Sequence, residues 1–298
     1  MMLHKKCVGV IGATSLIGEY LLPLLVDKGY EVVAFSREEL HVKSSAVGPV
    51  EWQWLSGLQS VEIHKRKKQI NYWISLAPIR ALPEYFSFLL DYGAKHVVAV
   101  SSTSRFTKED SPDAAEKKLA RNLAENEERL IAWAGKENLT FTILRPTLVY
   151  ALGLDRNVSV IASFIQRFSF FCVFGDARGL RQPVHAQDVA LACAEALSAE
   201  AAKNRCYNIS GGEIISYRKM VNRIFAALEK KPRFVKFPLW LFRLAVFILR
   251  IFPHYRQWSV AMAQRMNEDM VFDHTEASRD LHFFPRGFRP VREDLPEA

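Results

Sequence analysis

Short apolar runs rich in β-branched residues alternate with amphipathic stretches along the first half of the chain. The apolar runs predict strands near residues 7–12, 30–35, 50–54, 70–76, 95–102 and 140–145. The amphipathic stretches between them predict helices, most clearly at 16–28, 83–92 and 111–135. Strands that alternate with helices are typical of a parallel sheet with helices on both faces. The pattern therefore predicts an α/β chain with a doubly wound parallel sheet.

The pattern becomes less regular beyond Pro146. Short strands are expected at 183–185 and 205–209, with helices at 187–198 and 216–229. We therefore expect a first domain over residues 1–150 and a smaller, interleaved C-terminal lobe over 151–298. Some strands and helices of this lobe are expected to return to the first sheet.

The longest predicted helix, 111–135, consists mostly of strong helix formers such as Ala, Glu, Lys, Arg and Leu. Its start at Ser111-Pro112 fits an N-cap residue followed by proline at the first helical position. We therefore expect the helix to begin at Pro112.

The turn after the first predicted strand has the residue types that hold a dinucleotide. Gly12 lets the chain turn sharply, and Gly18 allows the next helix to pack closely on the strand. The start of that helix offers free N–H groups and a positive dipole end to a pyrophosphate. The alternative is a merely tight structural turn. The residues predicted to bind the cofactor here are Gly12, Thr14, Ser15, Leu16, Ile17 and Gly18.

Composition and charge narrow the classes of partner. The apolar fraction is 49% and the charged fraction 24%, which excludes a disordered chain. The net charge of +8 favours an anionic partner, either a small molecule, an acidic membrane surface or a nucleic acid. No nucleic-acid-binding module is recognisable, and the basic run 64–68 is interpreted as a solvated loop or helix end. We therefore expect a small anionic ligand and no nucleic acid.

The four cysteines form no Cys-x-x-Cys pair and have apolar sequence neighbours, so they are interpreted as buried thiols of a reducing compartment. The first strand is predicted within a few residues of the N-terminus, so no signal peptide is expected. A cytoplasmic location is expected, and no metal site is predicted.

An unusually apolar segment covers residues 237–252, bounded by Pro238 and Pro253. A helix between these prolines is about 22 Å long, too short for a bilayer core of about 30 Å. It is either a helix buried in the small lobe or one that lies in a membrane interface, which would give the chain a peripheral membrane contact.

Several further motifs follow one another in a familiar order. They are residues 74–77 (ISLA), 100–103 (VSST), 143–150 (ILRPTLVY), 181–190 (RQPVHAQDVA) and 207–212 (YNISGG). With the glycine turn, they make the chain resemble the extended short-chain dehydrogenase/reductase family, which includes nucleotide-sugar epimerases and dehydratases. The resemblance implies a Rossmann fold with a substrate-binding lobe, and an NAD(P)-dependent enzyme.

The resemblance also implies which residues surround the cofactor. In this family the residue that ends the second strand selects the cofactor, and an acid there binds the ribose hydroxyls of NAD. This chain has Ser36 and Arg37 instead, and an arginine can pair with a 2′-phosphate, so NADP is expected and NAD is the alternative. The other positions that the resemblance assigns to the cofactor are Leu76, Ala77, Pro78, Ser101, Ser102, Pro146 and Val149.

The catalytic pattern departs from the family. Family members use a Ser or Thr after the fifth strand and a Tyr-x-x-x-Lys pair on the next helix, where the tyrosine is the acid/base. Thr103 stands at the Ser/Thr position, but Leu119 and Leu123 fall where the pair is expected. Lys117 and Lys118, slightly upstream, are candidates to reach the ribose instead. Candidate substitutes for the phenol are Tyr150 first, and then Asp110, Glu116 and His185.

Two arginines resemble those with which the nucleotide-sugar enzymes grip a diphosphate. Arg181 and Arg265 are the predicted substrate-binding residues, since a guanidinium donates bidentately to phosphate. The alternative for each is a structural salt bridge. His185 and Asp188 are interpreted as structural residues at a strand end and a helix start.

Two functions of different class remain open. The first is an NAD(P)-dependent oxidoreductase, epimerase or dehydratase that acts on a nucleotide sugar or a similar phosphorylated molecule, with a lipid-linked or quinone-like substrate as a variant. The second is a dinucleotide-binding sensor or accessory subunit without turnover. By analogy with the family, a homodimer through 83–92 and 114–133 is expected.

Overall fold

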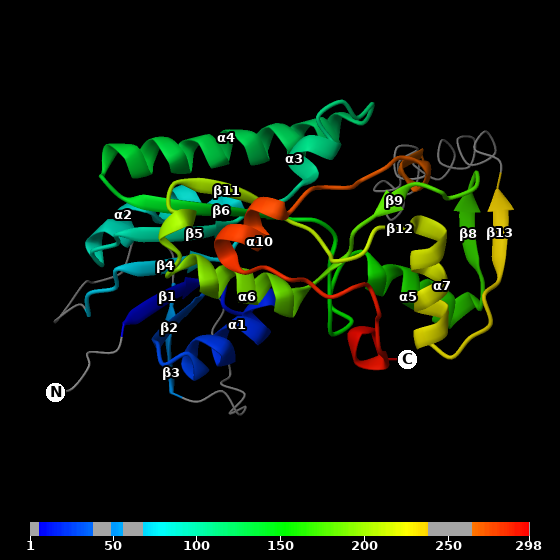
Figure 1. Cartoon of the computed structure of the whole chain (residues 1–298), viewed down its shortest axis with the longest axis horizontal. Helices are drawn as coiled ribbons and strands as arrows, with labels where there is room; N and C mark the ends of the chain where they lie inside the picture. The colour runs from blue at the N-terminus through cyan, green and yellow to red at the C-terminus, as the bar shows by residue number, and fades with distance from the viewer. Residues whose placement is uncertain (1–5, 38–48, 56–67, 238–263, 298) are drawn as a thin grey trace.

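The computed structural model describes residues 6–37, 49–55, 68–237 and 264–297. Seven parallel strands form one sheet in the order β11-β6-β5-β4-β1-β2-β3 (Figure 1). The strands are β1 (Cys7–Ile11), β2 (Glu31–Ser36), β3 (Val50–Trp54), β4 (Tyr72–Ser75), β5 (His96–Val100), β6 (Thr140–Pro146) and β11 (Arg205–Ile209). The doubly wound parallel sheet and its six predicted strands are confirmed.

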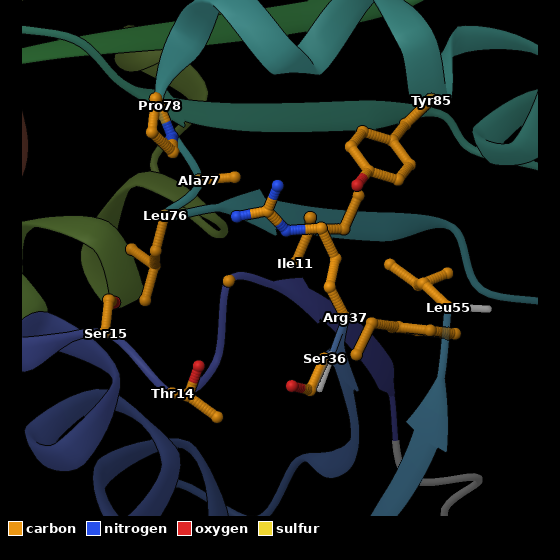
Figure 2. Close-up of a pocket in the computed structure, with 12 residues that line it drawn as sticks. Ile11, Thr14, Ser15, Ser36, Arg37, Leu55, Leu76, Ala77, Pro78 and Tyr85 are labelled. Atoms are coloured by element: carbon orange, nitrogen blue, oxygen red, sulfur yellow. The ribbon is translucent and has the colours of Figure 1, made fainter. Parts of the chain in front are cut away.

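The strand order reverses between β1 and β4, and their carboxyl ends lie side by side (Figure 2). The Leu76 N–H, just past β4, donates to the Ile11 carbonyl at the end of β1 at 2.8 Å. In open α/β sheets such a switch point is where ligands bind. The topology therefore makes this edge the candidate site.

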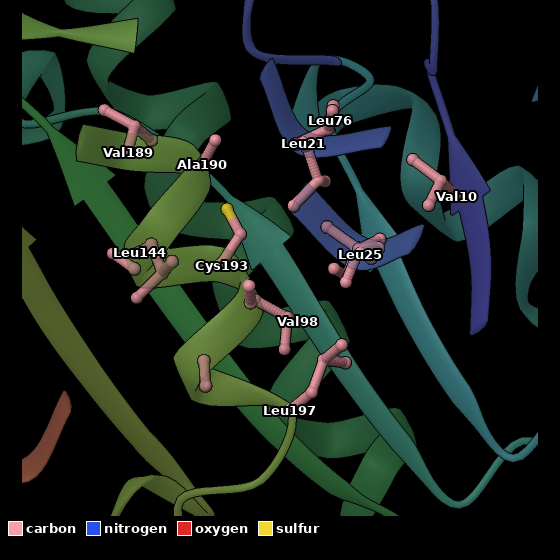
Figure 3. Packing of buried hydrophobic residues seen from close by; sticks show 14 of the residues in the cluster. Val10, Leu21, Leu25, Leu76, Val98, Leu144, Val189, Ala190, Cys193 and Leu197 are labelled. Atoms are coloured by element: carbon pink, nitrogen blue, oxygen red, sulfur yellow. The ribbon is translucent and has the colours of Figure 1, made fainter. Parts of the chain in front are cut away.

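Helices cover both faces of the sheet because its strands are apolar on both sides. In β2, Val32 and Ala34 join one buried cluster, whereas Val33 and Phe35 join the other. Successive side chains of a strand point to opposite faces, so a continuous apolar run needs two layers of helices. Leu21, Leu25, Cys193 and Leu197 cover one face of the sheet (Figure 3).

The helices of that first face are α1 (Leu16–Asp27), α6 (Ala186–Ala196) and α10 (Thr275–Leu281). The second face is covered by η1 (Ile79–Tyr85), α2 (Phe86–Asp91) and α4 (Ala114–Lys136). The helix predicted at 83–92 is thus a 3-10 helix followed by a short α-helix. A one-turn helix, α3 (Ser104–Thr107), precedes α4.

The start of α4 differs from the prediction by two residues. Asp113 is the N-cap, and its carboxylate accepts the N–H of Ala115 at 2.9 Å. Ser111, the predicted cap, donates its hydroxyl to the Glu116 carboxylate at 2.7 Å. Aspartate caps a helix as well as serine does, so the prediction that the helix begins at Pro112 was wrong.

The second half of the chain builds its own buried cluster and also contributes to the first sheet. Around this cluster lie α5 (Val158–Phe168), α7 (Tyr217–Ala227) and the paired strands β8 (Phe171–Phe174) and β13 (Phe234–Phe237). The short pairs are β7 (Val149–Tyr150) with β10 (Val184–His185), and β9 (Leu180–Arg181) with β12 (Ile215–Ser216). The 3-10 turns are η2 (Glu200–Ala202), η4 (Arg265–Asn267) and η5 (Arg292–Asp294).

Three elements of this half return to the first sheet. β11 is its seventh strand and pairs with β6, α6 packs against α1, and α10 packs against α6 and β11. The strands and helices predicted beyond Pro146 are therefore found, whereas the domain boundary at residue 150 stays a prediction.

Three sequence features were used to predict the partners and the cellular location of the protein: the apolar segment, the basic run and the cysteines. Residues 238–252 of the apolar segment, and the basic run except Lys68, lie outside the described residues. Within the described ranges, no helix is long and apolar enough to cross a membrane.

Only Cys193 is fully buried, and the other three cysteines are half-buried, so the prediction of four buried thiols was wrong. Cys206 lies on the outermost strand and Cys172 on a two-stranded pair, where cover is incomplete.

We expect stability to fall as the pH drops from 7.5 to 5.5, because two histidines are held neutral. Burial lowers the pKa of His96, whose ring contacts the Thr140 hydroxyl and the Ala196 carbonyl, and burial also lowers the pKa of His274. The folded state then binds fewer protons than the unfolded state, so stability is complete above the unfolded pKa of about 6.5 and is lost below it. Urea unfolding at both pH values measures this slope.

The variant His96→Gln should reduce the slope, because glutamine does not titrate. His282→Gln removes an exposed histidine and serves as the control. An unchanged slope in His96→Gln would contradict the assignment.

Candidate active site

The turn between β1 and α1 requires glycine at its first position. Gly12 has a φ of +74°, and a Cβ there would lie 2.6 Å from the Ala77 backbone nitrogen. Only glycine adopts this conformation without strain and allows so close an approach. The turn is thereby held tightly against the chain that leaves β4.

The start of α1 leaves two backbone donors free. Ser15 is the N-cap, with a φ of −74°, and its hydroxyl accepts the Gly18 N–H at 3.3 Å. The Ser15 N–H donates to the Gly12 carbonyl at 3.0 Å. Among the described residues, no acceptor is found for the N–H groups of Leu16 and Ile17. These donors and the helix dipole form an anion site of the kind that holds a pyrophosphate.

A cavity of about 180 Å³ opens beside this turn (Figure 2). Eight of the residues predicted for the cofactor line it: Gly12, Thr14, Ser15, Ser36, Arg37, Leu76, Ala77 and Pro78. The sequence analysis missed four lining residues: Ile11, Phe35, Leu55 and Tyr85. Ile11 and Phe35 belong to predicted strands, Tyr85 belongs to the helix predicted at 83–92, and Leu55 directly follows a predicted strand, but no motif marked any of the four as a cofactor residue.

Arg37 gives this cavity its charge. Its side chain extends from the end of β2 across the cavity toward Ala77 (Figure 2). The Trp54 indole donates to the Arg37 carbonyl at 2.7 Å and thereby fixes the backbone there. No aspartate or glutamate is among the residues that line this cavity, and within the described part of the chain no ion pair of Arg37 is found. The guanidinium is thus a cation placed in a ligand-sized space.

The phenol of Tyr85 also lines this cavity and faces Arg37 (Figure 2). Burial raises the pKa of its phenol. The phenol is therefore protonated at neutral pH and can donate a hydrogen bond.

A second cavity, of about 240 Å³, continues from the first and shares Leu76, Ala77 and Pro78 with it. Its other lining residues are Ile79, Arg80, Val100, Ser101, Leu119, Asn122 and Leu123. Of the predicted cofactor residues, it adds Ser101. Leu119 and Leu123, the positions where the family has tyrosine and lysine, both face this space, whereas Lys117 and Lys118 do not line it.

A buried ion-pair cluster adjoins the second cavity through Ser101, which lines it. The Glu127 carboxylate on α4 is fully buried and accepts the Ser101 hydroxyl at 2.5 Å. It also accepts Arg145 Nη2 at 2.6 Å and the guanidinium of Arg105. The cluster ties α4 to the ends of β5 and β6. The sequence analysis missed Glu127, although it is an acid on the apolar face of an amphipathic helix.

The two predicted catalytic residues lie outside both cavities. The Thr103 side chain is buried and donates to the Pro146 carbonyl at 3.2 Å. Tyr150 is 1% exposed and packs against His185 and Phe288. Burial, followed by the Asp294 charge, raises the pKa of Tyr150 well above its ordinary value. A catalytic role for either residue stays a prediction.

The remaining predicted cofactor residues do not line either cavity. Gly18 is packed inside the turn, where a Cβ would lie 2.0 Å from the Ala13 carbonyl oxygen. Ser102 accepts the Ser104 N–H at 3.1 Å. The other four, for which only backbone or packing contacts are found, are Leu16, Ile17, Pro146 and Val149.

Arg181 and Arg265 are brought together, but both have protein partners. The buried Arg181 guanidinium donates to the carbonyl oxygens of Leu180 at 2.8 Å and Glu268 at 2.7 Å, and to that of Arg265. Arg265 pairs with the Glu116 carboxylate of α4. Although burial opposes it, the hydrogen bond from Arg265 holds the pKa of Glu116 below its ordinary value. These contacts are the structural alternative, and a role in binding a diphosphate stays a prediction.

His185 and Asp188 have structural partners. His185 is the N-cap of α6 and accepts the Gln187 N–H at 3.1 Å, while its other ring nitrogen contacts Asp294 at 3.0 Å. Asp188 accepts from the Arg286 backbone N–H at 3.0 Å and from its guanidinium. Within the described ranges, no group of three His, Cys, Asp or Glu side chains is arranged to hold a metal ion.

Comparison with known proteins supports the fold. Residues 86–210 match the model of the NAD dependent epimerase/dehydratase family. The solved structure of a UDP-glucuronic acid 4-epimerase from Bacillus cereus in complex with NAD superposes with a TM-score of 0.71 and 14% identity, covering 97% of this chain and 94% of that one.

Two curated relatives match this chain over a smaller share of their own length. UDP-glucose 4-epimerase of Vibrio cholerae is 24% identical over 168 residues, which is 52% of this chain and 50% of the relative. The chloroplastic divinyl chlorophyllide a 8-vinyl-reductase of Cucumis sativus is 22% identical over 82% of this chain and 63% of the relative. The chain thus spans half to two thirds of the length of these relatives. The resemblance that the motifs indicated is confirmed: this chain has the fold of the extended short-chain dehydrogenase/reductases, and its residues 86–210 match the NAD dependent epimerase/dehydratase family.

Proposed function

We propose that the chain binds a nicotinamide dinucleotide, with NADP(H) preferred over NAD(H), and uses it on a nucleotide sugar or a similarly phosphorylated small molecule. One observation carries the proposal. The cavity at the switch point is lined by Gly12, by Ser15 at the start of α1 and by the cation of Arg37, and the free N–H groups of Leu16 and Ile17 follow Ser15 directly. These are a pyrophosphate site and a 2′-phosphate site on one continuous surface.

Each group has a distinct task in this proposal. The Leu16 and Ile17 N–H groups hold the pyrophosphate, and the absence of a side chain at Gly12 allows it to approach. The Arg37 guanidinium pairs with the 2′-phosphate, and Tyr85 donates a hydrogen bond at the same end. The bound dinucleotide supplies hydride acceptance or donation. The sugar-nucleotide substrate is supported by the names of the UDP-sugar epimerases to which the chain is similar.

The variant Arg37→Ala is expected to remove the preference for NADP(H). A charge-assisted hydrogen bond to phosphate contributes about 1.5–3 kcal/mol, so NADP affinity should fall about 10- to 100-fold while NAD affinity stays nearly constant. Isothermal titration calorimetry with both cofactors measures the two changes. Arg178→Ala removes the same charge from an 85% exposed side chain and is the control. Equal affinity of the unchanged protein for NAD and NADP would contradict the proposed preference for NADP(H).

A second function, binding without turnover, is favoured by the two leucines of the second cavity. Leu119 and Leu123 offer no proton donor and no acceptor where the family has its tyrosine and lysine. An enzyme would need its acid/base from another residue. Tyr150 is too deeply buried to exchange protons readily.

Turnover should therefore be independent of Tyr150. We expect Tyr150→Phe to retain the full rate of any NADPH-dependent reaction found with a panel of nucleotide sugars, followed by absorbance at 340 nm. A large loss of rate in a folded Tyr150→Phe protein would assign the phenol a direct role. Firm cofactor binding with no turnover on the whole panel would establish the sensor in place of the enzyme.

A further inference from the structure

The helix α5 carries apolar side chains on two opposite sides. On its inner side, Ile161 and Ile165 are buried in the cluster of the second half of the chain. On its outer side, Val160, Phe164 and Phe168 follow one another at intervals of four residues, and Val160 is 56% and Phe168 48% exposed. A helix that covers a core on one side usually has polar residues on the other. The outer stripe of α5 is therefore an apolar surface that faces solvent.

The stripe ends in a group of aromatic rings at the last turn of α5. The ring centroid of Phe164 lies 4.7 Å from that of Phe168 and 5.6 Å from that of Phe170. The Lys230 ammonium donates to the Gln166 carbonyl at 2.8 Å. The segment that follows α7 is thereby held beside this aromatic group.

Four exposed basic residues lie on α5, just before it, or in the segment that follows α7. They are Arg156, Arg167, Lys231 and Arg233. In the part of the chain that the structure describes, no ion pair is found for any of them. The acids of the same segments are Asp155, whose carboxylate accepts the Ser159 hydroxyl at 2.5 Å, and the exposed Glu229. The cations thus outnumber the carboxylates. We call the stripe, Phe170 and these four basic residues the α5 face.

An anionic phospholipid surface matches both properties of the α5 face. Its acyl chains take up apolar side chains, and its phosphates attract unpaired cations. A second copy of this chain would bring like charges together across the same contact, so self-association is disfavoured. The apolar segment 237–252 also begins at the last residue of β13, beside β8, and its composition fits the same kind of surface.

We propose that the α5 face is a membrane-contact surface, through which the chain lies on a bilayer that contains anionic phospholipids. Figure 1 shows α5 and α7 in the part of the molecule that lies apart from the seven-stranded sheet. The surface is therefore separate from the cavity at the ends of β1 and β4. The inference does not depend on cofactor binding, so either proposal can fail without the other.

Sedimentation of the full chain with lipid vesicles tests the inference. One set of vesicles is phosphatidylcholine alone, and the other is an equimolar mixture of phosphatidylcholine and phosphatidylserine. We expect binding to the mixed vesicles only, and release at high salt, because salt screens the attraction between the basic residues and the lipid phosphates. Equal binding to both sets, or no binding to either, overturns the inference. The second result would leave the face to an acidic protein partner.

Two variants locate the contact on the α5 face. Arg167→Gln with Arg233→Gln removes two cations, each of which contributes about fivefold to partitioning onto an anionic surface, so binding should weaken about 25-fold. Phe168→Ser removes an exposed apolar side chain and should weaken binding about tenfold. Circular dichroism checks that both variants are folded.

Matched controls remove the same groups elsewhere. Arg178→Gln with Arg279→Gln lowers the net charge equally at side chains that are 85% and 63% exposed. Phe284→Ser removes a phenylalanine that is 80% exposed. Both controls should bind the mixed vesicles as the unchanged protein does. If the α5 variants bind no more weakly than their controls, another part of the chain makes the contact and the inference is overturned.

Discussion

Gly12→Ala is expected to weaken NADP(H) binding about 100-fold, the largest effect of a single substitution on the site. The new Cβ would lie 2.6 Å from the Ala77 nitrogen and 2.9 Å from the Leu76 carbonyl carbon, so the turn must move away from the end of β4. Moving the turn displaces the N–H groups of α1 from the pyrophosphate. Losing about 2.7 kcal/mol of charge-assisted hydrogen bonding corresponds to this factor. Calorimetry with NADP measures it.

Gly135→Ala is the matched control for this substitution. Gly135 lies in α4, and an added Cβ meets no atom within 4 Å. Alanine is the better helix former, so this variant should bind NADP normally and unfold at an equal or higher temperature. Circular dichroism confirms that Gly12→Ala is folded before its binding is measured. If folded Gly12→Ala binds as tightly as Gly135→Ala, the phosphate site has been placed wrongly.

Glu127→Gln is expected to lower the free energy of unfolding by about 3 kcal/mol, the largest effect on stability. The carboxylate is fully buried, and its removal leaves Arg145 without its anion and Arg105 with only the exposed Glu128 carboxylate at 3.9 Å. Breaking one side of a buried ion pair typically costs about 3–5 kcal/mol, and the partial exposure of both arginines places the effect at the lower end. Urea denaturation gives the value directly.

The neighbouring Glu128→Gln provides the control on the same helix. Its carboxylate is 70% exposed and lies 3.9 Å from Arg105, so its loss should change stability by less than about 0.5 kcal/mol. Equal stability of the two variants would show that the buried cluster contributes no more than a surface pair does.

The local sequence determined the sheet, the glycine turn and the position of Arg37. Period-2 and continuous apolar patterns record which faces of a strand are covered, so β2 and its partners were predictable from residues within one segment. The turn at Gly12 was predictable because a positive φ and a helix start impose their residue types locally. The two leucines on α4 were likewise located from sequence spacing, and both face the second cavity.

The tertiary structure alone decided the partners of the charged and polar side chains. Arg265 pairs with Glu116, which lies 149 residues away, and Arg181 donates to carbonyls of the 265–268 segment. Tyr85 reaches the first cavity from η1, and Tyr150 is enclosed by His185 and Phe288. A residue's type and its neighbours in sequence specify the hydrogen bonds it can make, but packing decides which distant group is near enough to make them. For that reason the sequence located the edge of the sheet at which we propose that the cofactor binds, whereas the surroundings of the arginines, of Glu127 and of Tyr150 became known only from the packed chain.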